Sequence, residues 1–184
     1  MGSADLKVPL AGFLAESAGS VRHLEFDPIT IDLDDDLVLG GPISGALELS
    51  RTNRGIFVRG EVRTTLSMDC SRCLGPAGVE LAAVIREEIL PALDPVTGQV
   101  VDPSIERDVM RLTAHNELEV ESLLREAISL SAPIAPLCRP DCPGLCPECG
   151  APLADGHPPH EIDVIDPRLA ALRGFRVDAD ARNE

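Results

Sequence analysis

Cysteines are the residues of this chain whose type and spacing most clearly indicate chemistry. They are Cys70, Cys73, Cys138, Cys142, Cys146 and Cys149. All six lie in closely spaced groups, and two of the groups have the spacing Cys-x-x-Cys. Zn²⁺ takes four thiolate or imidazole ligands in a tetrahedron, and one tight Cys-x-x-Cys turn supplies two of them. Gly150, directly after the last pair, lets backbone amides close around a sulfur without a Cβ in the way. The pattern therefore predicts a bound metal ion, with zinc the favoured one.

The choice of ligands leaves two arrangements open. In the first, Cys138, Cys142, Cys146 and Cys149 close one site by themselves. In the second, the Cys70/Cys73 pair faces the Cys146/Cys149 pair, as in zinc ribbons, and ties the C-terminal segment to a sheet. His157 and His160 follow the cluster and could add nitrogen ligands, or could be exposed residues of a loop rich in Gly and Pro.

Thiol redox chemistry is the main alternative to metal binding. A thioredoxin-like Cys-x-x-Cys motif places its first cysteine at a helix N-terminus after a strand, where the helix dipole lowers the thiol pKa. Cys70 instead lies between two predicted strands, and Cys146 lies in a loop rich in Pro and Gly. The setting therefore favours a metal, although thiolates alone do not distinguish zinc from an iron–sulfur cluster.

Composition limits the compartment and the class of protein. The 184 residues correspond to about one domain, and the core must be aliphatic because there are four Phe and no Trp or Tyr. The sequence has no apolar run long enough to span a membrane, and its first residues do not lead us to expect a secretory signal. A reducing cytoplasm is therefore expected, where clustered cysteines usually bind metal. No catalytic triad, phosphate-binding glycine loop or His-x-x-x-His pair is present, so no enzymatic activity is predicted.

The net charge of −15, from 31 acidic and 16 basic residues, has the wrong sign for a protein that grips nucleic acid mainly through phosphates. A basic partner such as a ribosomal protein is the simpler expectation. Local RNA contact remains open through arginines of the predicted hairpin, which could equally serve solubility. They are Arg51, Arg54, Arg59, Arg63 and Arg72.

Alternating apolar and polar residues predict an antiparallel meander. Residues 43–50 and 56–66 form a period-two hairpin, and residues 79–85 continue as a third strand. The turn at residues 52–55 ends in Gly55, at a position that can take a positive φ. The Cys70/Cys73 pair occupies the second connection.

Residues 119–130 carry apolar side chains at helical spacing and predict a helix that delivers the cysteine cluster to a defined place. We expect Asn116 to cap this helix, with Glu119 completing a capping box. A second short helix is expected over residues 166–174, because Asp166 and Pro167 begin it and Gly174 ends it.

Four ordered motifs together resemble the bacterial YceD family. They are Cys70-Ser-Arg-Cys-Leu-x-Pro76, Leu130-x-x-Pro133-x-x-Pro136-Leu-Cys138, Asp141-Cys-Pro-Gly-Leu-Cys-Pro-Glu-Cys-Gly150 and Asp166-Pro-Arg-Leu-Ala-Ala-Leu172. Family members are implicated in accumulation of the large-subunit (23S) ribosomal RNA, and their genes commonly neighbour that of a large-subunit ribosomal protein. The resemblance implies a non-enzymatic role in assembly of the 50S subunit, with a precursor 50S particle, rRNA or a basic large-subunit ribosomal protein as partner. A redox protein that uses the Cys-x-x-Cys pairs is the alternative.

The expected fold is α+β: a small antiparallel β-meander or partly open barrel with accessory helices and a C-terminal zinc-ribbon-like cysteine cluster. Residues 1–40 are expected to form strands and a helical turn that pack on the sheet. Residues 41–175 would form the family domain, with structural zinc bound in segment 138–150, and residues 176–184 a disordered tail.

Overall fold

The computed structural model describes residues 6–33, 37–93, 98–100, 109–153, 156–158 and 168–169. The chain divides into two compact units, Met1–Cys142 and Pro143–Glu184, which are treated separately below. Of the expected helix over 166–174, only Arg168 and Leu169 are among the described residues, and the expected tail at 176–184 lies outside them.

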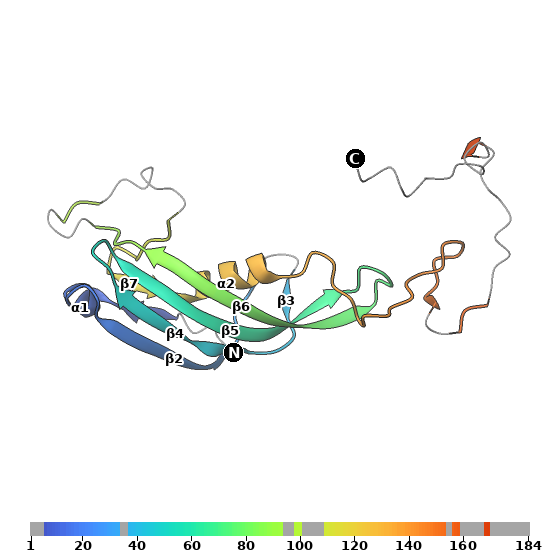
Figure 1. Cartoon of the computed structure of the whole chain (residues 1–184), viewed down its shortest axis with the longest axis horizontal. Helices are drawn as coiled ribbons and strands as arrows, with labels where there is room; N and C mark the ends of the chain where they lie inside the picture. The colour runs from blue at the N-terminus through green and yellow to red at the C-terminus, as the bar shows by residue number, and fades with distance from the viewer. Residues whose placement is uncertain are drawn as a thin grey trace, which may run out of the picture. The chain divides into compact units, whose positions relative to one another are not determined.

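The first unit is built on an antiparallel sheet with a long central hairpin (Figure 1). Its strands are β2 (Val21–Ile29), β3 (Val38–Leu39), β4 (Ile43–Arg51), β5 (Ile56–Asp69) and β6 (Pro76–Ile89). Strand β5 pairs with β6 along its whole length, with β4 over its first half, and with β3 farther along. Strand β2 extends the sheet beyond β4. The predicted meander is confirmed, and its third strand begins earlier and ends later than expected.

Period-two alternation decides which face of this sheet is buried. Val58, Val62 and Leu66 of β5 point inward and are fully or almost fully buried, whereas Arg59 and Arg63 between them are exposed. Apolar side chains at every second position give the strand one water-free face, which is the physical reason that the register is well defined.

In the turn between β4 and β5, Gly55 does not use the positive φ that its position could take. A Cβ at Gly55 would lie 2.3 Å from the carbonyl oxygen of Ile89, so glycine is required by close approach of two backbones. Thr52 closes the turn: its N–H donates to the Gly55 carbonyl at 3.0 Å, and its Oγ1 accepts from the Gly55 N–H at 2.9 Å.

The predicted helix is present as α2 (Val120–Ser131), but its expected cap is wrong. Glu119 occupies the N-cap position without a side-chain hydrogen bond, and Asn116 lies in a preceding turn with φ 57°. The reason is a short strand, β7 (Glu117–Glu119), which pairs with β1 (Lys7–Pro9) in a second sheet. Because β7 uses these residues in a strand ladder, the helix cannot begin before Val120.

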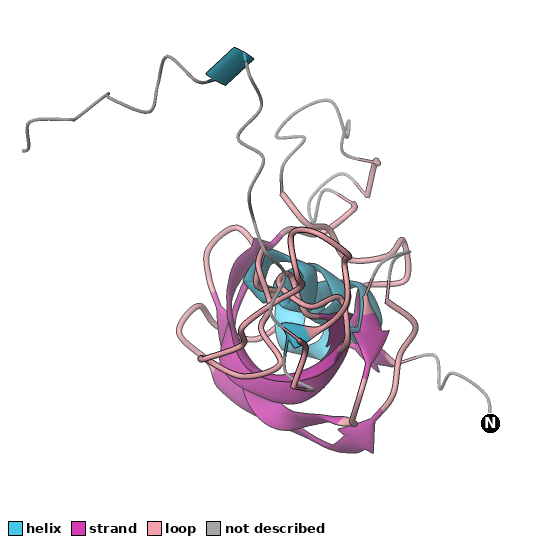
Figure 2. Cartoon of the chain, turned by 90° about the vertical axis from the view of Figure 1, so that its right-hand side faces the viewer, coloured by secondary structure: helices cyan, strands magenta, loops and turns pink. Residues whose placement is uncertain are grey.

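Helices cover the inner face of the curved sheet, which remains open and does not close into a barrel (Figure 2). Helix α1 (Ala11–Leu14) contributes Phe13, and α2 contributes Leu123, Leu124 and Ile128, all buried. These side chains join those of the sheet in one core that is aliphatic apart from Phe13 among its fully buried members. The α+β class is confirmed. None of the helices among the described residues is long and apolar enough to span a membrane.

Candidate metal centres

The first cysteine pair lies in the turn between β5 and β6. The Cys70 N–H donates to the Gly75 carbonyl at 2.8 Å, and the Leu74 N–H donates to the Cys70 carbonyl at 2.9 Å. We call this Cys-x-x-Cys turn, with its two hydrogen bonds, a knuckle. Leu74 has φ 58°, so this knuckle holds a leucine in the left-handed region that favours glycine.

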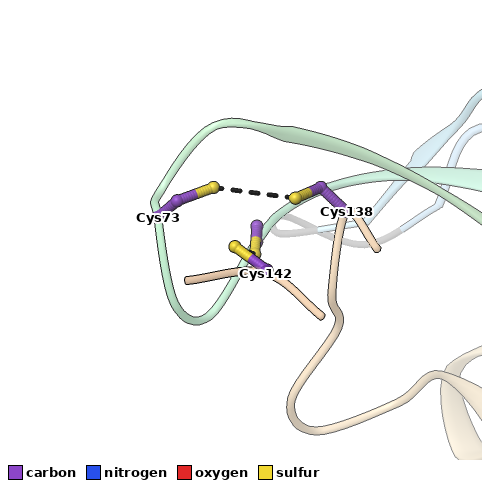
Figure 3. A group of neighbouring side chains, drawn as sticks. Cys73, Cys138 and Cys142 are labelled. Atoms are coloured by element: carbon purple, nitrogen blue, oxygen red, sulfur yellow. Dashed lines mark hydrogen bonds between the residues drawn. The ribbon is translucent and has the colours of Figure 1, made fainter. Parts of the chain in front are cut away.

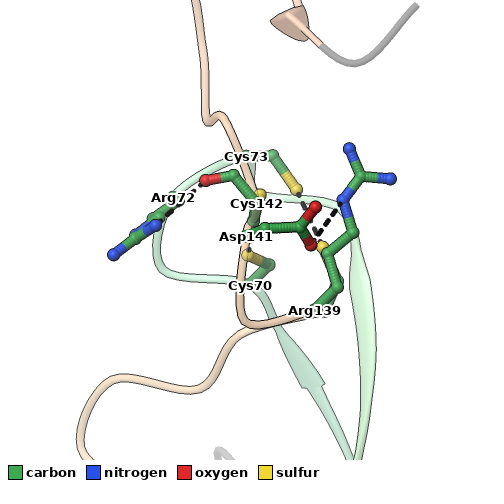
Figure 4. A network of polar contacts seen from close by, with 7 residues as sticks. Cys70, Arg72, Cys73, Arg139, Asp141 and Cys142 are labelled. Atoms are coloured by element: carbon green, nitrogen blue, oxygen red, sulfur yellow. Dashed lines mark hydrogen bonds and ion pairs between the residues drawn. The ribbon is translucent and has the colours of Figure 1, made fainter.

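The segment that follows α2 brings two more cysteines to this knuckle (Figure 4). The Pro136 carbonyl accepts the Ser71 N–H at 2.8 Å, and Arg72 Nη1 donates to the Cys142 carbonyl at 3.1 Å. These contacts fix Cys138 and Cys142 against the turn. The prolines after α2 limit the conformations of the segment, so little chain freedom remains to be lost when the four thiols meet.

Four thiols, of Cys70, Cys73, Cys138 and Cys142, have all their Sγ atoms within 4.8 Å of one another. The Sγ atoms of Cys73 and Cys138 are 3.8 Å apart (Figure 3). Those of Cys70 and Cys142 are also 3.8 Å apart. Zinc–sulfur bonds of about 2.3 Å in a tetrahedron give sulfur–sulfur edges of about 3.8 Å, so the spacing fits a tetrathiolate ion. All four cysteines are free thiols.

Within this group, backbone N–H donors lower the pKa of one thiol, whereas burial and neighbouring thiols raise the pKa of others. The N–H groups of Cys138 and Cys73 lower the pKa of Cys70 to about 6. The Cys142 thiol and burial raise the pKa of Cys138 to about 12. The Gly75 N–H favours the Cys73 thiolate, but the crowded thiols outweigh it and raise the pKa of Cys73. One thiolate is favoured and further ones repel it, so a cation at the centre is needed to ionise the whole set.

A second group of potential ligands lies within the Pro143–Glu184 unit: Cys146, Cys149 and His157, whose ligand atoms also lie within 4.8 Å of one another. The Sγ of Cys149 is 2.8 Å from Nε2 of His157. The N–H of Cys149 lowers the pKa of Cys146, which is buried.

The ligand grouping differs from both expected arrangements. Within the first unit, Cys138 and Cys142 lie with the Cys70/Cys73 pair, a grouping that neither expected arrangement contains. His160 lies outside the described residues. The signal that could have found the first group is the short proline segment after α2, which leaves Cys138 and Cys142 within reach of whatever α2 packs on.

The arginines proposed to face RNA have different surroundings. Arg51 donates to the carbonyls of Leu14, Thr52 and Gly55 and so holds the β4–β5 turn, where Arg54 is exposed. Arg72 contacts the first cysteine group. Two of the set lie on the outer face of the sheet, where Arg59 pairs with Glu48 at 2.7 Å and Arg63 with Glu61 at 2.8 Å. The hydrogen bond from Arg59 lowers the pKa of Glu48.

The outer face of the sheet carries both signs of charge. Register places His23, Glu48, Arg59 and Arg86 in one row across the four strands. The charged side chains of this face are Arg59, Arg63 and Arg86 against Glu25, Glu48, Glu61, Asp69, Glu80 and Glu88. Carboxylates outnumber guanidinium groups there, so the face has no basic stripe of the kind that tracks a phosphate backbone.

Curated relatives of this chain come from mycobacteria and bear the name uncharacterized protein. Proteins of Mycobacterium bovis and Mycobacterium tuberculosis are 34% identical over 126 residues, which is 68% of this chain and 58% of each relative. A protein of Mycobacterium leprae is 29% identical over 133 residues, 72% of this chain and 58% of the relative. The chain thus spans less than two thirds of the length of these relatives. No solved structure matches it.

A family model matches residues 58–176, from the central hairpin through both cysteine groups. Its description is large ribosomal RNA subunit accumulation protein YceD. The match covers more than half of the chain and includes every cysteine, so the chain belongs to the YceD family.

Proposed function

We propose that this chain is a non-enzymatic cytoplasmic factor for accumulation of 23S rRNA and assembly of the 50S subunit, stabilised by a structural zinc ion. The observation that carries the proposal is membership of a family described as large ribosomal RNA subunit accumulation protein. The role of an assembly factor requires a defined surface more than a reaction centre, and the acidic chain provides such a surface.

The structural zinc ion is assigned to Cys70, Cys73, Cys138 and Cys142. Support comes from the two sulfur–sulfur distances of 3.8 Å, which match the edges of a zinc tetrathiolate. The ion would join the β5–β6 turn to the segment after α2, so its binding free energy would contribute directly to folding. Cys70 is fully buried and Cys142 is 3% exposed, which suits a structural ligand better than a reactive thiol.

Thiol accessibility separates this proposal from the alternative of a thiol redox protein. We expect the purified, metal-loaded protein to react slowly with a thiol reagent until a strong chelator is added, because metal-bound thiolates are poor nucleophiles toward bulky reagents. A redox pair would instead react at once and cycle between dithiol and disulfide. Fast reaction of Cys70 or Cys73 before chelation would contradict the structural zinc.

A basic large-subunit ribosomal protein is the partner that the charge favours, within a precursor 50S particle. The net charge is −15, and the outer face of the sheet carries more carboxylates than guanidinium groups. An acidic surface attracts basic ribosomal proteins before they are neutralised by rRNA, and it repels bare phosphate. Direct contact with rRNA would then depend on Arg59 and Arg63 exchanging their glutamate partners for phosphates.

Depletion of the protein tests the assembly role. We expect the 23S rRNA and 50S particles to fall relative to 16S rRNA and 30S particles, and the wild-type chain to restore them. An unchanged ratio would refute the assembly role and would bring the redox alternative forward.

Replacement of two arginines in the same cells tests RNA contact. Arg59→Gln/Arg63→Gln removes two ion pairs on the outer face of the sheet, where ion pairs in contact with water contribute little to stability, so the fold should survive. Arg22→Gln is the control, since Arg22 is an exposed arginine that contacts Phe13 at the edge of the sheet. If binding depends mainly on the ribosomal protein, both variants should complement fully. Failure of the Arg59/Arg63 variant alone would assign rRNA contact to the outer face.

A further inference from the structure

We propose that the Pro143–Glu184 unit binds a second, separate metal ion of the zinc class through Cys146 Sγ, Cys149 Sγ and His157 Nε2. This centre is distinct from the tetrathiolate centre because its three ligands belong to one compact unit and the four thiols of the first centre belong to the other. The inference does not depend on the ribosomal role.

The first argument is that the two Cys-x-x-Cys turns have the same backbone geometry. The Cys146 N–H donates to the Ala151 carbonyl at 2.8 Å, and the Gly150 N–H donates to the Cys146 carbonyl at 2.9 Å. These are the donor and acceptor positions of the Cys70 knuckle, counted from the first cysteine. The residue after the second cysteine has a positive φ in both, 58° at Leu74 and 73° at Gly150. Two turns that aim their sulfurs alike are suited to the same kind of ligand.

The second argument is the nitrogen ligand. Gly156 has φ 70°, and directly after this turn Nε2 of His157 lies 2.8 Å from Cys149 Sγ. In a zinc site with bonds of about 2.3 Å to sulfur and 2.0–2.1 Å to nitrogen, the sulfur–nitrogen edge is about 3.5 Å. The imidazole would therefore have to withdraw by less than about 1 Å, which rotation about its χ angles provides.

A third argument is the hairpin that carries this knuckle. Leu145 and Pro152 form an antiparallel bridge, and the Leu153 N–H donates to the Gly144 carbonyl at 3.0 Å. The cysteines are therefore held on a closed loop of fewer than a dozen residues, Gly144–Leu153, in which only Gly144 and Cys146 are buried. Such short loops usually require a metal or a disulfide to be ordered.

The ligand types determine how the two centres differ. Two thiolates and one imidazole suit zinc, whereas four thiolates would also accept iron. Two thiolates neutralise Zn²⁺, and four leave a net charge of −2, so the second centre has weaker electrostatic attraction for the ion. Among the described residues three ligands are available, and a fourth position is left for water. We therefore expect the second ion to leave first under a chelator.

Metal content of the full chain tests the proposal. Native mass spectrometry of protein purified with zinc should give two ions per chain for the wild type and one for Cys146→Ser/Cys149→Ser. Cys73→Ser/Cys138→Ser should also retain one ion. With cobalt in place of zinc, the charge-transfer absorption per ion should be smaller in Cys73→Ser/Cys138→Ser, whose remaining centre has two thiolates. It should be larger in Cys146→Ser/Cys149→Ser, whose remaining centre has four. A single ion in the wild type, or equal metal content in the wild type and the Cys146/Cys149 variant, would overturn the proposal.

The histidine has its own matched control. His157→Gln should lose the second ion at a chelator concentration at least ten times lower than His115→Gln, since His115 lies in an exposed turn of the other unit. Equal chelator resistance of the two variants would remove His157 from the ligand set and overturn the assignment as stated. Circular dichroism of each variant checks that the sheet of the first unit is unchanged.

Discussion

Glycine at position 74 should give a more stable protein than alanine at the same position, and the sign of this difference tests the knuckle geometry. Leu74 follows the Cys70/Cys73 pair with φ 58°. An L-residue in the left-handed region costs roughly 1–2 kcal/mol, which glycine avoids. Glycine also makes the unfolded chain more flexible, at a cost of about 0.4–1 kcal/mol. The net change in the free energy of unfolding from alanine to glycine at this position should be about +0.8 kcal/mol.

The comparison must isolate the backbone, because Leu74 is 67% exposed and loses some contact in either variant. Leu74→Ala and Leu74→Gly both remove the leucine side chain, so their difference reports the positive φ alone. Glu126, exposed in the middle of α2, provides the matched pair Glu126→Ala and Glu126→Gly. In a helix the same step from alanine to glycine costs about 1 kcal/mol.

Urea unfolding of the metal-loaded variants measures these four values, with the slope of the transition checked for constancy. The step from alanine to glycine should raise the urea midpoint at residue 74 and lower it at residue 126, a difference of about 2 kcal/mol between the two positions. A fall in stability at both positions would mean that Leu74 has an ordinary negative φ, and the shared geometry of the two knuckles would then be wrong.

Three further predictions follow from the first unit. Gly60→Ala places a Cβ 2.4 Å from the Ala46 carbonyl oxygen and should cost at least about 2 kcal/mol in urea unfolding, whereas Gly78→Ala, whose nearest atom is 3.9 Å away, should be neutral. Arg51→Ala removes a guanidinium that donates to three carbonyls and should cost about 2 kcal/mol, with Arg54→Ala within about 0.5 kcal/mol of wild type; equal effects would refute the structural role of Arg51. Chelation should increase hydrogen exchange at residues 68–77 and leave residues 56–63 protected; uniform loss of protection would mean that the ion supports the whole sheet.

The hairpin could be predicted from sequence because one pattern, strict alternation over residues 56–66, admits one interpretation. The helix was predictable for the same reason, since Leu123, Leu124 and Ile128 repeat at helical spacing. Its start was not, because the choice between capping by Asn116 and pairing of Glu117–Glu119 depends on β1, more than a hundred residues away. The conformational preferences of residues 116–119 do not indicate a partner strand that lies so far away in the sequence.

The cysteine grouping could not be predicted for a related reason. Spacing alone allows Cys142 to join either neighbour, and four cysteines in a row suggest one site. The structure instead uses the chain between Cys142 and Cys146 as the boundary of the two units. Which cysteines join the Cys70/Cys73 pair depends on how far the segment after α2 extends from the end of that helix. The position of the helix end is set by the packing of α2 and cannot be read from the cysteine motif.

The position of the first centre follows from how the sheet ends. Strand β4 pairs with β5 only over Ile56–Arg63, and β3 adds two further pairs. Beyond these, the distal part of the β5–β6 hairpin has no other strand beside it among the described residues, and an isolated two-stranded hairpin is marginally stable in water. The buried side chains at that end, Cys70, Ala77 and Cys142, form a small cluster separate from the main core. A metal ion bound by the cysteines there would supply the stabilisation that this end of the hairpin lacks, which explains why ligands and not aliphatic side chains occupy the turn.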